Sequence, residues 1–267
     1  GDKQMVQSRE DNYVAPHKIF ADEDTLCPKA MDQFDSAIRQ PFVRQAALMP
    51  DVHAGYSLPI GSVVATEGMV LPSWVGYDIG CGMCAVSTTF TADDVRHYAK
   101  DIHHEIHRAI PTGFNKHAHP KEPPISLLCR QVSPVLAEIS ERRGAWLQLG
   151  TLGGGNHFIE VGADENDTVW IIIHSGSRGT GHGVAEHYMR NASGDGKVRE
   201  GHFGFHPESG IGQEYIKDHD WCVQYALENR KAMITAVVES MQQFLSGRGQ
   251  WGQLINRSHN HVEKFGE

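Results

Sequence analysis

The stretch LGTLGGGNHFIEVGADENDTVWIIIHSGSRGTGH, residues 149–182, decides how this chain folds. Between its two glycine-rich turns lies an uninterrupted apolar run at residues 169–173. A short run without polar alternation is typical of a strand that is buried on both faces. We therefore expect a core strand here, and His174 should lie at the point where that strand ends.

The turns on either side of this strand have the composition of a ligand site. Residues 175–181 are rich in Gly and Ser, so backbone N–H groups can converge on an anion, and Arg178 adds a fork of donors. Upstream, the three glycines at 153–155 let the backbone approach a ligand closely. We expect Asn156, Phe158 and Glu160 to share one strand face because they alternate with their neighbours. Together these features predict a site for a metal and a phosphate.

Composition places the chain among ordinary globular proteins. It has 267 residues, 40% of them hydrophobic and 21% charged, which suits a real core. The sequence contains no apolar run of about 20 residues, so we expect no membrane partner. Five scattered cysteines predict a reducing, cytoplasmic setting. The formal charge of −9 argues against nucleic-acid binding through bulk charge, so an RNA site would have to be local.

Periodicity predicts a mixed α+β fold in a single domain, residues 1–267. We expect helices at residues 22–40, 92–110, 127–139, 183–190 and 213–245, and strands at 42–48, 60–66, 69–71, 85–90, 169–173 and 254–262. Pro134 should disturb the middle of the third helix. The segment 111–124, rich in Pro and His, is expected to be a mobile loop.

Four places along the chain could supply metal ligands: Asp78 with Cys81, His157, His174, and either His259 or His261. A single buried histidine is more often a hydrogen-bonded core residue, and a single buried cysteine an inert thiol. Several such residues beside glycine-rich backbone favour a metal. The softness of Cys and His ligands points to zinc first. No second CxxC accompanies Cys81 and Cys84, so a zinc ribbon is a poor interpretation, and the Ser175 region has no nucleophile elbow.

Five motifs together resemble the RtcB family of RNA ligases, and they occur in that family's order. They are MPDVHAGYSLPIGSV (49–63), VGYDIGCGM (75–83), LGTLGGGNHFIEV (149–161), HSGSRGTGH (174–182) and SHN (258–260). The resemblance implies an α+β fold with a sandwich-like β core surrounded by helices. It also implies an enzyme that joins RNA ends bearing a 2′,3′-cyclic phosphate or 3′-phosphate to a 5′-hydroxyl end. Such a ligase uses GTP and two Mn²⁺ ions, passes through histidine–GMP and RNA-(3′)pp(5′)G intermediates, and can need an accessory activating protein.

The resemblance also assigns roles to individual residues. Cys81 would bridge the two ions, with Asp78 and His157 completing one site and His174 and His259 the other, so manganese replaces zinc as the expected metal. His259 is preferred to His261 because the family has a histidine directly before asparagine.

The GTP site would follow on the next residues along the chain. Asn156, beside the metal ligand His157, would contact GTP phosphate, and Phe158 and Glu160 would lie near the guanine. Arg178 would hold the RNA 3′-phosphate, a role that suits the bidentate geometry of guanidinium.

One family motif has no counterpart among these 267 residues. It is the His-Gly-Ala-Gly-Arg segment, whose histidine becomes guanylylated. We therefore expect the chain to be an N-terminal portion of a longer protein. Two alternatives are a guanylylation-incompetent paralogue that binds metal and RNA ends, and a two-metal phosphoesterase.

Overall fold

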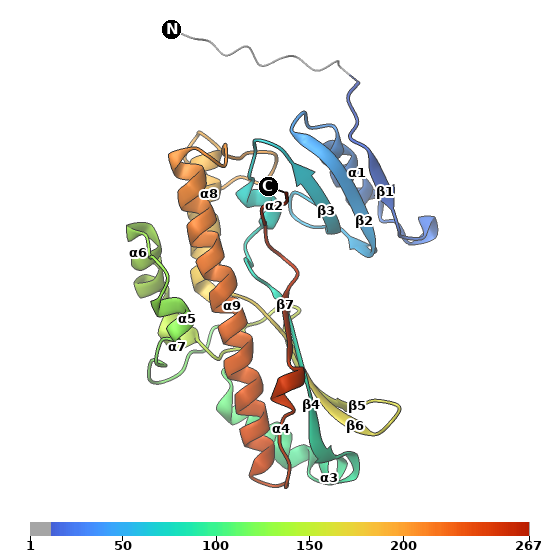
Figure 1. Ribbon diagram of the computed structural model, residues 1–267, viewed down its shortest axis with the longest axis vertical. Coiled ribbons are helices and arrows are strands. Elements are labelled where there is room, and N and C mark those ends of the chain that lie inside the picture. Colours follow the sequence, from blue (N-terminus) through green and yellow to red (C-terminus); the bar gives the residue numbers. More distant parts are fainter. Residues whose placement is uncertain (1–11, 267) are drawn as a thin grey trace. The chain divides into compact units, whose positions relative to one another are not determined.

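The computed structural model describes residues 12–266 of the chain (Figure 1). These residues fall into two compact units. The first is formed by the described residues up to 76 together with 187–213, and the second by 77–186 together with the described residues from 214. Each unit therefore takes its residues from separate parts of the sequence, and each has its own sheet.

The first unit is built on a three-stranded sheet in the order β1-β2-β3. Its elements are β1 (His17–Ile19), η1 (Glu23–Thr25), α1 (Pro28–Ile38), β2 (Val43–His53), β3 (Ile60–Thr66) and α2 (Pro72–Val75). Strand β1 is parallel to β2, and β2 is antiparallel to β3. Helix α1 starts with proline at its first turn, which suits that position, and buries Phe34 and Ile38 against Leu48 of β2.

The second unit is built on a four-stranded sheet in the order β5-β6-β4-β7. Its elements are β4 (Gly82–Thr91), α3 (Ala92–His97), α4 (Ala99–Ala109), α5 (Ile125–Leu128), α6 (Pro134–Arg143), α7 (Ala145–Gln148), β5 (Phe158–Ala163), β6 (Thr168–Ser175), η2 (Trp251–Gln253) and β7 (Ile255–Ser258). Helices α8 (Arg178–Ala192) and α9 (Gly210–Gln242) have most of their residues here and the remainder in the first unit. All neighbouring strands of this sheet are antiparallel.

The core of the second unit lies between its sheet and the helices α4 and α9. Alternate residues of β6, Val169, Ile171 and Ile173, are buried in one apolar cluster. The same cluster receives Met233 and Val237 from α9, the long helix of Figure 1. Burial of this alternating face fixes the register of the strand, because a shift by one residue would exchange its two faces. The end of β6 that carries His174 is fixed in the same way.

Several of the expected elements are confirmed. The strand at 60–66, the strand around 169–173 and the long helix near 213–245 correspond to β3, β6 and α9. The expected burial of the second strand on both faces is wrong, because Trp170 and Ile172 on its other face are only partly buried.

Others are wrong in position or type. Residues 69–71 form no strand but an isolated bridge from Val70 to Phe205. Helix α8 begins at Arg178 rather than at residue 183, and β7 is shorter than expected. Pro134 does not disturb a helix but opens α6, where a missing N–H costs nothing, and Ser133 accepts the cap bond from Leu136 N–H at 3.0 Å.

In the part of the chain that the structure describes, no helix is both long enough and apolar enough to cross a membrane.

Candidate metal centre

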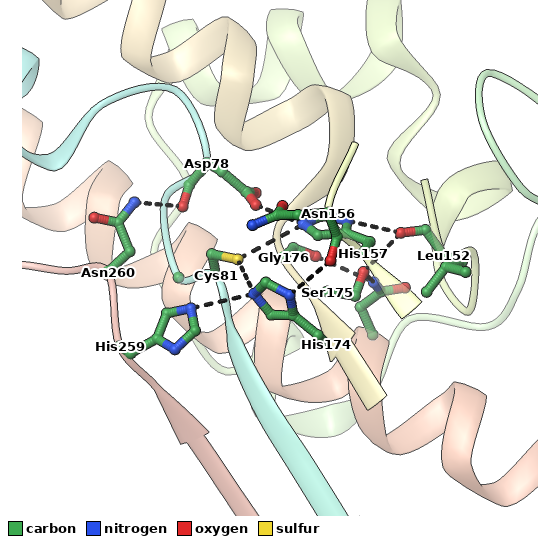
Figure 2. Close-up of polar contacts among 12 residues, drawn as sticks. Asp78, Cys81, Leu152, Asn156, His157, His174, Ser175, Gly176, His259 and Asn260 are labelled. Atoms are coloured by element: carbon green, nitrogen blue, oxygen red, sulfur yellow. Dashed lines mark hydrogen bonds and ion pairs between the residues drawn. The ribbon is translucent and has the colours of Figure 1, made fainter. Parts of the chain in front are cut away.

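The antiparallel register of the second sheet gathers four candidate ligands at one end of its strands (Figure 2). Cys81 directly precedes β4, and His157 directly precedes β5. His174 is next to last in β6, and His259 directly follows β7. His174 lies opposite both Met83 of β4 and Phe158 of β5, and Ser258 of β7 lies opposite Gly82 of β4. Residues far apart in the sequence therefore meet at the same edge.

Their side chains point toward one another. Cys81 Sγ lies 3.1 Å from His174 Nε2 and 3.6 Å from His157 Nε2. His157 Nε2 lies 2.9 Å from Asp78 Oδ2, and His174 Nε2 lies 3.3 Å from His259 Nε2. Cys81, His157 and His174 alone offer three ligand atoms that all lie within 4.8 Å of one another. Sulfur, nitrogen and oxygen donors thus converge on one small volume.

The other nitrogens of two histidines are held by backbone carbonyls. His157 Nδ1 lies 2.9 Å from the carbonyl oxygen of Leu152, and His174 Nδ1 lies 3.0 Å from that of Asn156. A carbonyl oxygen can only accept, so Nδ1 carries the proton and Nε2 of the neutral ring presents a lone pair. This orientation of imidazole by a second hydrogen bond is typical of metal-binding histidines.

Such tautomers leave one acceptor facing another. With a neutral ring, His157 Nε2 faces the Asp78 carboxylate, whereas His174 Nε2 lies where it can accept from the Cys81 thiol and beside His259 Nε2. Two lone pairs in contact require a cation between them, either a proton or a metal ion. The residues therefore fit a transition-metal site with mixed S, N and O donors.

Ionisation in the ion-free protein agrees with this interpretation. Burial, and then the neighbouring Asp78, raise the pKa of the Cys81 thiol well above its ordinary value. Burial lowers the pKa of His174, so that its ring stays neutral. Burial works to raise the pKa of Asp78, but a proton held between its carboxylate and His157 Nε2, with smaller contributions from Cys81 and Arg178, outweighs burial, and that pKa lies below its usual value. In the ion-free protein this proton takes the place of the cation. A bound cation would compensate the thiolate, which is costly without one.

Hydrogen bonds to backbone carbonyl oxygens hold the loop of Asp78 and the residues after β7 together. Asn260 Nδ2 donates to the Asp78 carbonyl oxygen at 2.7 Å, and His259 N–H donates to the Cys81 carbonyl oxygen at 2.8 Å. Gly176 lies against the Asp78 carboxylate, where an added Cβ would come within 2.0 Å of Oδ1. His259, and not His261, is therefore the histidine that the structure places against His174; the His261 ring lies near Glu263.

Two residues of α9 were not predicted from the sequence. They hold the backbone that carries the ligands of the centre. Arg230 is fully buried and donates through Nη1 to the carbonyl oxygens of Gly80 and Ser175, at 2.8 and 2.9 Å. Asn229, also fully buried, bonds the backbone of Thr151 and Gly176. No local signal marks this pair in the sequence, because the buried face of α9 also carries Asp218, His219 and Ser240, and a charged helix residue normally faces water.

Arg178 lies beside the centre in an unusual backbone conformation. Its φ is +55°, a value that is rare outside glycine. Its guanidinium packs on Gly153, where an added Cβ would lie 2.0 Å from Nη2. Burial lowers the pKa of Arg178. Arg178 Nε and the buried hydroxyls of Ser177 and Thr180 have no hydrogen-bond partner among residues 12–266.

The residues expected to contact a nucleotide lie on the exposed side of β5. Asn156 is exposed just before this strand, and Phe158 and Glu160 are exposed on alternate positions within it. The Phe158 ring lies 5.7 Å from the ring of His174. The shared face that alternation predicted for Phe158 and Glu160 is therefore confirmed, and this face adjoins the metal centre.

Comparison with known proteins points to one family. The family model "tRNA-splicing ligase RtcB" matches residues 33–142 and 130–266. RNA-splicing ligase RtcB of Escherichia coli strain K12 is 32% identical over 95% of this chain and 69% of its own length. The tRNA-splicing ligase RtcB of Methanococcus maripaludis is 28% identical over 90% of this chain and 62% of its own length. That of Pyrobaculum aerophilum is 33% identical over 55% of this chain and 40% of its own length.

Proposed function

Because the chain belongs to the RtcB family of RNA ligases, we propose that it forms the metal- and RNA-end-binding part of a GTP- and manganese-dependent ligase. The reaction joins an RNA 2′,3′-cyclic phosphate or 3′-phosphate end to a 5′-hydroxyl end, with or without an accessory activating protein. The sandwich-like β core and single catalytic domain that the family implies belong to the same proposal.

The observation that carries the proposal is the convergence of Asp78, Cys81, His157, His174 and His259 on one volume. Cys81 is the central residue, because its sulfur contacts two of the three histidines. We assign Cys81 as the bridge between two Mn²⁺ ions, with Asp78 and His157 on one side and His174 and His259 on the other. Bound metal would neutralise phosphate charge and orient the reacting oxygens.

The residues around the centre would bind the substrates. Asn156 would contact GTP phosphate next to His157, and Phe158 and Glu160 would flank the guanine. Arg178 would grip the RNA 3′-phosphate, since its Nε has no partner among the described residues and its guanidinium is backed by Gly153. Burial of this cation beside a phosphate strengthens their attraction, because the local dielectric is low.

Metal binding tests the centre directly. The wild-type chain should take up two equivalents of Mn²⁺, measured by loss of the free-ion signal in electron paramagnetic resonance. Cys81→Ala should abolish uptake at both positions, whereas Cys129→Ala, which removes an exposed cysteine elsewhere, should not. Equal uptake by wild type and Cys81→Ala would show that the centre is placed wrongly.

Activity can be tested without the guanylylated histidine. RNA that already ends in (3′)pp(5′)G is offered with a 5′-hydroxyl RNA and Mn²⁺, so that sealing does not require the guanylylated histidine. We expect joined RNA and released GMP. Release of inorganic phosphate from a 3′-phosphorylated RNA without any joining would instead identify a phosphoesterase.

A further inference from the structure

The segment from residue 111 to residue 121 is pinned beside the metal centre. Gly113 N–H donates to the Gly153 carbonyl oxygen at 2.7 Å, and Leu152 N–H donates to that of Pro111 at 3.0 Å. His117 N–H and Lys121 N–H make further backbone bonds to the segment around α7. These bonds give the loop a defined position, although its composition had suggested mobility.

This pinned loop presents a fully exposed aromatic side chain, Phe114. A single exposed aromatic side chain is common on protein surfaces, so exposure alone does not mark a binding residue. Phe114 differs in its place on an anchored loop beside the proposed site, and loops held by a rigid scaffold often carry binding residues. Space beside it is open: a Cβ added at Gly113 or at Gly155 would meet no atom within 4 Å. A flat group could therefore lie on the Phe114 ring without displacing protein atoms.

The loop also leads directly to the residue that we assign to the RNA phosphate. Phe114 directly follows Gly113, whose N–H donates to the Gly153 carbonyl oxygen. The Arg178 guanidinium in turn packs against the Cα of Gly153. From the spacing of successive Cα atoms, Phe114 Cα lies within roughly 12 Å of that guanidinium. A phosphate on Arg178 and a base on Phe114 can thus belong to one nucleotide.

Local charge favours a polyanion as the ligand. Residues 111–124 carry Lys116 and Lys121 against one acidic residue, Glu122 at the far end of the loop from Phe114, in a chain whose formal charge is −9. Lys116 is held at this site by a 2.8 Å bond from Nζ to the Arg143 carbonyl oxygen. Aromatic surface beside positive charge is the combination with which proteins bind single-stranded RNA.

We propose that Phe114 is a stacking platform for the base of the 3′-terminal RNA nucleotide, whose 3′-phosphate is held by Arg178. The platform selects unpaired RNA ends and tolerates any base, because every base has a π face. This inference rests on the proposed RNA-end binding and adds to it a subsite for the nucleobase.

The test combines a protein change with a substrate change. Fluorescence anisotropy with Mn²⁺ present gives the Kd of a short 3′-phosphorylated RNA and of the same RNA with an abasic 3′-terminal nucleotide. Phe114→Ala should weaken binding of the intact RNA by roughly 5- to 150-fold, the range for loss of one stacked base, and should leave binding of the abasic RNA unchanged. Phe114→Trp should restore the binding of the intact RNA to the wild-type Kd. Ile125→Ala, which removes another exposed apolar side chain (74% exposed) of the same unit, should change neither Kd.

The possible failures are distinguishable. If Phe114→Ala weakens both RNAs equally, or neither, while wild type still prefers 3′-phosphate over 3′-hydroxyl RNA, the stacking platform is overturned and the proposed function stands. If wild type shows no preference for the 3′-phosphate, the proposed function is overturned and the subsite with it.

Discussion

At the scale of single residues, Gly153 connects three parts of the site. Its carbonyl oxygen accepts from Gly113, its φ of +83° suits glycine, and the Arg178 guanidinium occupies the place of a side chain. We expect Gly153→Ala to displace Arg178 and strain the turn, because both the conformation and the space exclude a Cβ. Binding of 3′-phosphorylated RNA should fall at least tenfold, measured by anisotropy, while Mn²⁺ uptake is retained.

A neighbouring glycine provides the matched control for this substitution. Gly154 is exposed, and an added Cβ would have no contact closer than 3.8 Å, to Gly113 Cα. Gly154→Ala should therefore bind RNA as wild type does. Equal loss in both variants would mean that flexibility of the turn, and not the position of Arg178, governs binding.

Most residues of the candidate metal centre could be predicted from the sequence, because the backbone around them has an unusual composition. Cys81, His157 and His174 each adjoin glycine-rich backbone, which marks places where the chain makes room for a ligand. Arg230 was not predicted from the sequence, because a charged residue in a helix normally faces water and nothing local shows that this one is buried. Its partners, the carbonyls of Gly80 and Ser175, are distant in sequence.

At the scale of elements, α9 both covers the sheet and braces the metal centre. Arg230→Met would keep an apolar side chain in place but leave the carbonyl oxygens of Gly80 and Ser175 without their donor. Unsatisfied buried acceptors are costly, so we expect a loss of about 2–5 kcal/mol in the free energy of unfolding, measured by urea denaturation. Lys231→Met, at the exposed neighbouring position of the same helix, should change stability by less than about 0.5 kcal/mol.

Contact between α4 and the segment after α9 makes stability depend on acid pH. Glu105 of α4 accepts from Arg108 and, at 2.8 Å, from Gln243 Nε2, and these bonds lower its pKa from 4.5 to about 2. A carboxyl whose folded pKa is depressed stabilises the protein above its unfolded pKa and loses that contribution as pH falls through the folded value. The contribution of Glu105 should therefore be complete above pH 4.5 and vanish toward pH 2.

The measurement is a series of urea midpoints for wild type and Glu105→Gln. The difference in urea midpoint between wild type and Glu105→Gln should be largest at neutral pH and should shrink between pH 4.5 and 2. Glu141→Gln, at an exposed position of α6, should follow wild type across this range. A wild-type advantage that does not change with pH would contradict the assignment to Glu105.

Elements with strong periodicity were predictable, and their junctions were not. The apolar runs of β6 and α9 are long enough that burial dictates their type. The start of α6 was misjudged although its signal is local: Ser133 before Pro134 is a cap followed by a proline that suits a first turn. The early start of α8 had no such signal, since Arg178 enters it with a positive φ.

At the scale of the whole molecule, metal binding should appear as thermal stability. An ion that binds the folded chain alone stabilises it by about 2.7 kcal/mol at 100 times its Kd, so Mn²⁺ should raise Tm by several degrees. Scanning calorimetry with and without Mn²⁺ measures this shift, and EDTA should reverse it. Cys81→Ala should show no shift, and a shift of wild-type size in that variant would place the ion elsewhere.

The division into two units was not predictable from sequence. No linker composition marks it, because each unit draws on two separate parts of the chain and the helices α8 and α9 run through the boundaries. A sequence shows neighbours along the chain, whereas this boundary is defined by contacts between segments more than a hundred residues apart, such as Val70 with Phe205.

The pairing of β7 with β4 has a consequence for the order of events during synthesis. His259 N–H bonds the Cys81 carbonyl oxygen, so the last proposed ligand reaches its place only when residues near both ends of the second unit meet. Contacts of such long sequence separation form late, because a large loop must close first. A ribosome-bound chain would therefore present Asp78, Cys81, His157 and His174 before the fifth proposed ligand, His259, is in place. Tight metal uptake would then report that residue 259 has left the ribosome, and a chain that ends before this residue would lack its full set of proposed ligands.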